Sequence, residues 1–344
     1  MKTTSRNCCI DTIKGFACIA VVLIHYNWGN TFSTLIQVVG RFAVPFFFFV
    51  AGFYLPDHNS NITPAKVLQK IKHICILLSK SILFYSLFCI LWNLAMDSNW
   101  NLAAFVQEKI TADAILKLIL SSDPIVYGHL WYLLATMSCY VLLFFICRLL
   151  NRCGSFFLFI VLAALYILFA EFRAIFGIRN SYPLPGGKAL IISNLFFLRA
   201  LPFVVYGIFL RKMNTMHCRL PVSVLLAICL LGFLCAMIEH YYYGTILMYV
   251  GTFISVIAMS LIARSYPEKR IAVMEYIGSR LSVYVYIDHI AVGKTIDLIY
   301  TKLHLWGNTP WKLLRPILAL LSSLAVAQII VFCKQKMTVK KNCR

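Results

Sequence analysis

Four ionisable residues stand in or beside the first two apolar segments of the chain. Asp11, Lys14 and His25 belong to the first segment, and Arg41 opens the second. Ionisable side chains are costly inside a bilayer, so those found in apolar spans are usually functional. Imidazole is the usual general base near neutral pH, and guanidinium binds an oxyanion through paired N–H donors. His25 and Arg41, at facing ends of consecutive segments, therefore predict a site that takes a proton and stabilises an anion.

The spacing of the first segment arranges its polar residues on a helix. At ~3.6 residues per turn, the three ionisable side chains fall on roughly one face, together with Cys18. Lys14 and His25 are separated by close to three turns, or roughly 16 Å along the helix axis. Asp11 and Lys14, three residues apart, can form an ion pair. The alternative is that Asp11 and Lys14 anchor the helix at the headgroups while His25 caps its other end.

The composition indicates a protein that crosses a membrane several times. Of its 344 residues, 61% are hydrophobic and only 13% are charged, which is far outside the range of soluble globular domains. The net charge of +20 does not indicate nucleic-acid binding, because the basic residues lie in short loops between apolar runs. The 13 cysteines include no Cys-x-x-Cys pair, so we expect neither a disulfide framework nor a metal site. The first apolar run lacks a small-residue cleavage site, so we expect a retained span rather than a signal peptide.

Ten apolar runs each come close to the ~20 residues that a helix needs to cross a bilayer. They predict an all-α fold, a single domain over 1–344 built as a bundle of about ten transmembrane helices. The ninth run is the least apolar and is expected to face the bundle interior, since it contains Asp288, His289, Lys294 and Asp297. The predicted spans are 9–27, 37–55, 73–96, 129–149, 155–172, 190–210, 221–239, 244–263, 281–300 and 314–333.

Lys and Arg residues in the loops predict the orientation. With the N-terminus in the cytoplasm, the cytoplasmic segments hold most of the basic residues of the loops, as the positive-inside rule requires. Both termini are therefore expected in the cytoplasm, with His25 and Arg41 toward the outer face. Of the two long outer loops, 97–128 is expected to hold a short amphipathic helix. The other loop, 171–189, is expected to be irregular because of its Pro-Leu-Pro-Gly-Gly run.

Three segments resemble a known family. Asp-x-x-Lys-Gly-Phe-Ala at 11–17 is followed by an apolar run to His25, and Arg41 precedes Val-Pro-Phe-Phe-Phe-Phe-Val-Ala-Gly-Phe-Tyr. This pattern resembles the integral-membrane acyltransferase 3 family, of the O-acetyltransferase type. The family usually has Arg at the position of Lys14 and often Ser at that of Ala51. The resemblance implies that His25 is essential for acyl transfer.

The second segment, Gly-His-Leu-Trp-Tyr-Leu at 128–133, resembles the His-Leu-Trp-Phe/Tyr-Leu element of the family. The resemblance implies that His129 joins His25 and Arg41 as a catalytic residue that positions the acceptor or stabilises the oxyanion. The ring of Trp131 or Tyr132 is expected to stack on a sugar. The alternative for the aromatic residues is an aromatic belt at the membrane interface.

The third segment, 281–290, resembles the late part of the family in which a helix rich in Ser and Tyr reaches a histidine. Tyr286 and His289 share one helix face and are expected to bind the substrate. Asp288 points elsewhere, toward Lys294 or a neighbouring span. The alternative for His289 is a histidine held in the membrane by structural hydrogen bonds.

Basic residues near the cytoplasmic face predict where a phosphate-bearing donor would bind. The family has a basic pair at the position of Lys70 and Lys72, which are expected to contact the phosphates of acyl-CoA. The alternative is that both are ordinary positive-inside residues. Asp11 and Lys14 are expected at the inner end of the substrate path.

The resemblance implies a membrane O-acyltransferase of a bacterial cytoplasmic membrane. An acetyl or short acyl group would pass from cytoplasmic acetyl-CoA, or another acyl-CoA, to a hydroxyl of a cell-surface glycan or lipid-linked sugar. Acyl-CoA would be a co-substrate, and no permanently bound cofactor is expected. One alternative is a proton-coupled transporter or flippase for an amphipathic envelope precursor, because ionisable residues in the first and ninth spans would suit a carrier. Another is an inactive module that serves as a membrane partner for an envelope protein.

Overall fold

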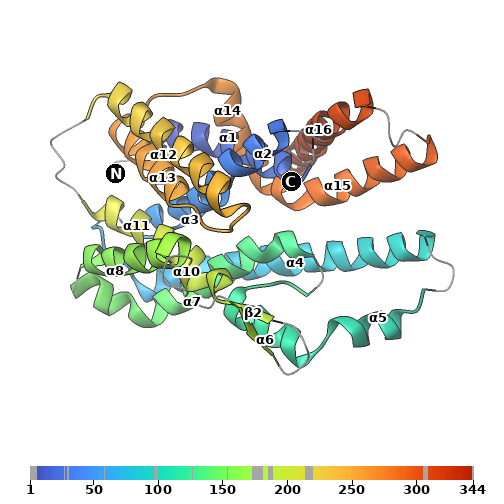
Figure 1. Ribbon diagram of the computed structural model, residues 1–344, viewed down its shortest axis with the longest axis horizontal. Coiled ribbons are helices and arrows are strands. Elements are labelled where there is room, and N and C mark those ends of the chain that lie inside the picture. Colours follow the sequence, from blue (N-terminus) through green and yellow to red (C-terminus); the bar gives the residue numbers. More distant parts are fainter. Residues whose placement is uncertain are drawn as a thin grey trace. The chain divides into compact units, whose positions relative to one another are not determined.

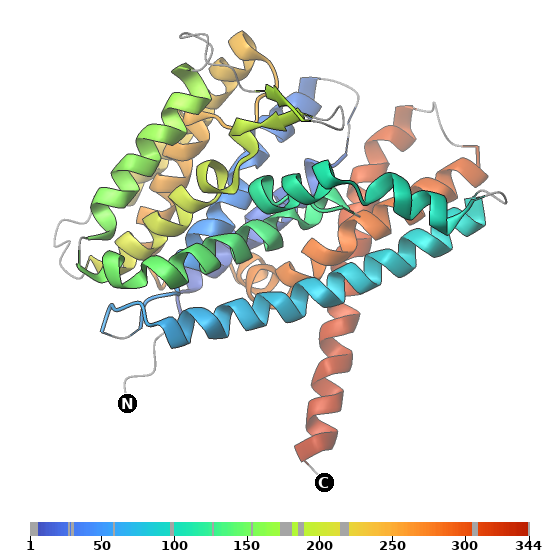
Figure 2. The same ribbon diagram turned by 90° about the horizontal axis from the view of Figure 1, so that it is seen from below.

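The structure, a computed structural model, is built almost entirely of helices (Figures 1 and 2). It describes residues 6–26, 28, 31–57, 59–96, 100–125, 127–152, 154–172, 181–184, 189–213, 220–304 and 309–342. The α-helices are α1 (Cys8–Leu23), α2 (Thr31–Val39), α3 (Ala43–Phe53), α4 (Pro64–Met96), α5 (Leu102–Lys109), α6 (Ala112–Ser121), α7 (Trp131–Arg152), α8 (Ser155–Ile167), α10 (Phe196–Arg199), α11 (Leu201–Lys212), α12 (Val222–Tyr243), α13 (Val250–Ser265), α14 (Ala272–Tyr276), α15 (Ser282–Lys302) and α16 (Thr309–Asn342).

Shorter elements connect or extend these helices. The 3₁₀ turns are η1 (Gly40–Phe42), η2 (Gly128–Leu130) and η4 (Ile192–Asn194), and the π-helical turns are η3 (Leu168–Phe172) and η5 (Ile277–Leu281). Two strands, β1 (Ser181–Pro183) and β2 (Ala189–Ile191), pair antiparallel. They lie in or beside the loop 171–189, so its described part is more regular than predicted. The loop 97–128 holds two helices, α5 and α6, where one was expected.

Five helices in the described part of the chain are long and apolar enough to cross a membrane. They are Phe32–Phe53, Pro64–Met96, Gly128–Arg152, Val222–Tyr243 and Leu313–Met337. Shorter apolar helices cover Ser155–Ala170 and Val250–Ser265. The all-α class is therefore confirmed, while the number of ten spans and the orientation of the termini stay predictions.

Two of the predicted spans are less regular than a single helix. The predicted span 37–55 is the second half of a longer apolar element in which η1 separates α2 from α3. Pro45 lies in the first turn of α3, where its missing N–H is tolerated. The predicted span 190–210 begins with β2 and η4 and becomes a continuous helix only at α11, where Pro202 lies in the first turn.

The chain divides into two compact units. The first unit comprises 1–47, 218–245 and 251–344. In it α1 packs on α14, η5 and α15, and α15 lies beside α16 (Figure 1). Glycines permit the closest of these contacts, since a Cβ atom at Gly15 would overlap the backbone of Met274 and one at Gly278 would overlap the carbonyl of Asp11. The backbones thus approach as closely as small residues allow between membrane helices.

The second unit comprises 48–217 and 246–250. Here α4 packs along α7, and α8 packs on α11. Glycines also permit the close contact of α3 with α11. A Cβ atom at Gly52 would overlap the carbonyl of Val204, and one at Gly207 would overlap that of Phe49. Tyr166 is buried in this unit, and its hydroxyl donates to the carbonyl of Tyr249 at 3.1 Å.

Candidate active site

Helix α1 carries His25 just beyond its C-terminal end. Asn7 caps its start by accepting a hydrogen bond from the Ile10 N–H at 2.8 Å. The helix ends at Leu23, earlier than the predicted span 9–27, because the next backbone bonds tighten to a spacing of three residues. The His25 N–H donates to Val22 at 3.1 Å, and the Tyr26 N–H donates to Leu23 at 3.2 Å. His25 therefore lies on a turn rather than within the helix, and its side chain is exposed.

A second histidine, from α15, packs against His25. The ring centroids of His25 and His289 are 5.1 Å apart, with the planes tilted by 41°. His289 is completely buried, and its Nδ1 lies 2.9 Å from the carbonyl oxygen of Val285. A carbonyl can only accept, so Nδ1 must carry the hydrogen of this bond, and Nε2 of a neutral His289 ring then holds the lone pair. The pair consists of an exposed imidazole backed by a buried one with a fixed tautomer.

Arg41 is brought to the same end of α1. It lies in η1, and the preceding residue, Gly40, packs so closely on α1 that an added Cβ would press on the Ile24 side chain. Ile24 immediately precedes His25. The segment that carries Arg41 thus packs beside the residue that precedes His25, and the shared role of His25 and Arg41 stays a prediction. The ring centroid of Tyr286 lies 6.3 Å from that of His289.

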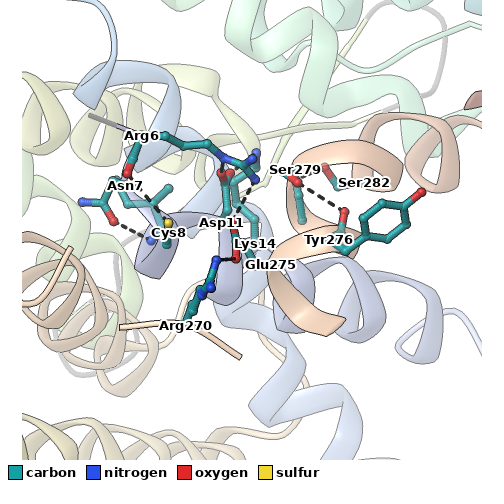
Figure 3. Close-up of polar contacts among 12 residues, drawn as sticks. Arg6, Asn7, Cys8, Asp11, Lys14, Arg270, Glu275, Tyr276, Ser279 and Ser282 are labelled. Carbon is teal, nitrogen blue, oxygen red and sulfur yellow. Dashed lines mark hydrogen bonds and ion pairs between the residues drawn. The ribbon is translucent and has the colours of Figure 1, made fainter. Parts of the chain in front are cut away.

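The opposite end of α1 carries a network of ion pairs (Figure 3). Asp11 accepts from Lys14 Nζ at 3.0 Å, as its spacing predicted, and from Arg6 Nε at 2.7 Å. Glu275 of α14 lies 3.3 Å from Arg6 and 3.7 Å from Arg270. The hydrogen bond to Asp11 raises the pKa of the Arg6 guanidinium. The network ties the start of α1 to α14 and leaves Lys14 partly accessible beside Asp11.

The second unit holds His129 in an aromatic cluster. His129 lies in η2 and is buried, with its ring centroid 4.6 Å from that of Tyr85 and 6.1 Å from that of Tyr127. Trp131, two residues on, has the Arg199 guanidinium carbon 3.9 Å from its ring centroid. The proposed stacking of a sugar on Trp131 stays a prediction, and so does the catalytic role of His129.

A family model that describes an acyltransferase domain, Acyl_transf_3, matches residues 8–333, nearly the entire chain. The chain belongs to the acyltransferase 3 family. No curated protein and no solved structure matches it. Membership of acyltransferase 3, together with the long apolar helices, identifies an integral membrane protein of an acyltransferase family. The match includes the His25, Arg41 and His129 segments on which the resemblance was based.

Lys70 and Lys72 both lie near the start of α4. They are the residues predicted to contact the phosphates of the acyl-CoA donor in this acyltransferase 3 chain. Residues two apart on a helix point to different sides. Lys70 is half-buried and Lys72 is exposed. A contact with the phosphates of acyl-CoA is therefore a separate prediction for each lysine.

Sequence reasoning missed several polar residues of this acyltransferase 3 chain. Arg199, which also donates to the Asn194 side chain at 3.1 Å, could have been found, because it is a charged residue inside a predicted span. Arg6 and Glu275 gave no such signal, since both lie in segments that were expected to be ordinary basic loops. Their contact with Asp11 depends on the packing of α14 against α1.

Asp288 on α15 is a further ionisable residue inside an apolar helix. Only 6% of its surface is exposed, and neither carboxylate oxygen has a hydrogen-bond partner among the described residues. It therefore does not pair with Lys294, one of the two directions that the sequence left open. Asp297, nine residues farther along the same helix, is instead held by Arg315 through bonds of 2.6 and 2.7 Å.

The contrast between the two carboxylates gives a testable prediction. Asp288→Leu should raise the melting temperature of the detergent-purified protein, because an unpaired buried polar group costs about 1–3 kcal/mol. The matched variant Asp297→Leu should lower it, since Arg315 then loses its partner. Thermal unfolding followed by tryptophan fluorescence measures both. Equal losses of stability in the two variants would show that the Asp288 carboxylate is stabilising where it lies.

Proposed function

We propose that this chain is a membrane O-acyltransferase that moves an acetyl or short acyl group from acyl-CoA to a hydroxyl of a cell-surface glycan or lipid-linked sugar. The observation that carries the proposal is the pairing of an exposed His25 with a buried His289 whose Nδ1–H is held by Val285. An accessible imidazole with a fixed neighbour suits a general base. Membership of the acyltransferase 3 family supports the reaction class.

The proposed reaction begins when His25 takes the proton of the acceptor hydroxyl. The hydroxyl oxygen attacks the thioester carbonyl, and a carbon–oxygen bond forms. Arg41 stabilises the negative charge that develops on the carbonyl oxygen, or positions the acceptor. The family resemblance assigns the same role to His129. The carbon–sulfur bond then breaks, and the proton held by His25 passes to the departing CoA thiolate. The products are an O-acyl ester and free CoA.

The donor is proposed to enter from the cytoplasm of a bacterial cell, with both termini on that side of the cytoplasmic membrane. The distribution of Lys and Arg over the loops supports this orientation. Lys70 and Lys72 would then meet the CoA phosphates, and Asp11 with Lys14 would order the inner end of the path. His25 lies beyond the other end of α1, so the pantetheine arm that carries the acyl group would have to reach through the bundle to His25.

A transfer assay tests this function against the carrier alternative. Membranes that contain the protein are supplied with acetyl-CoA labelled either in its acetyl group or in its CoA part. An acyltransferase should move only the acetyl label into the glycan or lipid-linked fraction, whereas a transporter or flippase moves neither. Membranes that lack the protein provide the background. Absence of acetyl transfer from every acyl-CoA supplied, combined with loss of glycan export in a deletion strain, would favour the carrier.

A further inference from the structure

Tyr26 follows His25 directly and points into the protein. Its side chain is buried, with 4% of its surface exposed, while that of His25 is exposed. The Tyr26 hydroxyl donates to the main-chain carbonyl of His289 at 3.3 Å. The residue next to the exposed histidine is thus bonded to the backbone of the buried one.

The helix α15 is built to receive this hydroxyl. Gly293 lies one turn beyond His289, and the Tyr26 hydroxyl occupies the place where a Cβ atom of residue 293 would lie. The Cζ and Cε1 atoms of Tyr26 would lie 3.0 and 3.3 Å from such a Cβ. A glycine inside a helix is normally unfavourable relative to alanine, so the absence of a side chain here has a packing reason. Tyr26 fits against α15 only because position 293 is a glycine.

An ion pair holds the tyrosine ring from another direction. The guanidinium carbon of Arg315, on α16, lies 5.2 Å from the centroid of the Tyr26 ring, within the range of a cation–π contact. The guanidinium is fixed in turn by the two hydrogen bonds to Asp297 of α15. Paired bonds of this kind set the plane of the guanidinium as well as its position. Tyr26 is therefore fixed by contacts from both α15 and α16.

We propose that Tyr26 is a positioning residue of the candidate active site. It joins the turn that carries His25 to the His289 backbone, and so it sets the separation and tilt of the two imidazoles. This inference rests on the proposed function of His25 as the base of acyl transfer. Because Tyr26 is buried, we propose that it acts through the two imidazoles and not on the acceptor or donor, so its loss should change the rate of the chemical step more than substrate binding.

Tyr26→Phe removes only the hydroxyl. We expect kcat for acetyl transfer to fall about tenfold, with KM for acetyl-CoA unchanged, because small errors in the position of a catalytic group strongly reduce rate. The matched control is Tyr166→Phe, which removes the same kind of buried hydroxyl-to-carbonyl bond in the second unit. It should leave both constants unchanged.

A second-site variant makes the test specific. Gly293→Ala places a methyl group against the Tyr26 hydroxyl, and we expect kcat to fall about 100-fold. Adding Tyr26→Phe to Gly293→Ala removes the oxygen that clashes and should restore kcat about tenfold over Gly293→Ala alone. Two unrelated losses of stability would instead add. The proposal is overturned if Tyr26→Phe has the kinetic constants of the natural chain and the double variant shows no recovery.

A chemical readout separates this proposal from the proposed function. Diethyl pyrocarbonate modifies accessible imidazoles, and mass spectrometry of peptides locates the product. His25 should react in all proteins, whereas buried His289 should react only in Gly293→Ala and, more slowly, in Tyr26→Phe. If the natural chain transfers no acyl group, the proposed function fails, and the protection of His289 alone decides the role of Tyr26. Protection that is equal in all variants overturns that role.

Discussion

Acetyl transfer by His25→Ala is expected to fall by about 10²- to 10⁴-fold, the usual contribution of a positioned general base. Alanine leaves the acceptor hydroxyl without a group to take its proton, while Arg41 and His289 stay in place. Because the His25 side chain is exposed at a turn, its removal leaves no cavity in the core. The initial rate of label transfer from acetyl-CoA, in membranes with equal amounts of protein, measures the effect.

His73→Ala provides the matched control for this experiment. His73 is an exposed histidine on α4, in the second unit, and its loss should leave transfer within a factor of two. The proposed mechanism would be wrong if His25→Ala retained the rate of the natural chain. Family membership would survive that result, since it rests on a match over residues 8–333.

Gly278→Ala is expected to destabilise the first unit strongly. The added methyl group would overlap the Asp11 carbonyl and lie 2.6 Å from the Gly15 nitrogen and 2.9 Å from Lys14 Cβ. Overpacking usually costs about 1–3 kcal/mol, and more where neighbours cannot move. Two of these neighbours are backbone atoms of α1, so the cost should lie at or above the upper end. The melting temperature in detergent should fall by several degrees, together with the yield of folded protein.

Gly128→Ala is the control for the same substitution elsewhere. Nothing lies within 4 Å of a Cβ atom built at Gly128, which begins η2, so its melting temperature should stay close to that of the natural chain. Equal melting temperatures for the two variants would contradict the close approach of α1 and η5. This close approach sets the position of α15 along α1, and therefore the position of His289.

Features that depend on local spacing could be predicted from the sequence. The high apolar content and long apolar runs predicted membrane helices, since a bilayer accepts little else. Asp11 and Lys14 pair as their spacing of three residues requires. The segments around His25, Arg41 and His129 were sufficient to predict the family. Spacing did not predict where α1 ends. The apolar run continues to His25, whereas the helix ends at Leu23, where the backbone hydrogen bonds tighten.

Which distant residues meet depends on the packing of the helices and could not be predicted from spacing. The contacts of His25 with His289 and of Tyr26 with Gly293 join segments from opposite ends of the chain. The relative placement of α1 and α15 comes from backbone approach at Gly15 and Gly278, and a glycine in a sequence does not show which helix it faces. Nothing in the sequence distinguishes the carboxylates of Asp288 and Asp297. Among the described residues, however, the Asp288 carboxylate has no hydrogen-bond partner, whereas that of Asp297 binds Arg315. Helical periodicity fixes a side chain on its own helix, whereas the packing of neighbouring helices decides what that side chain contacts.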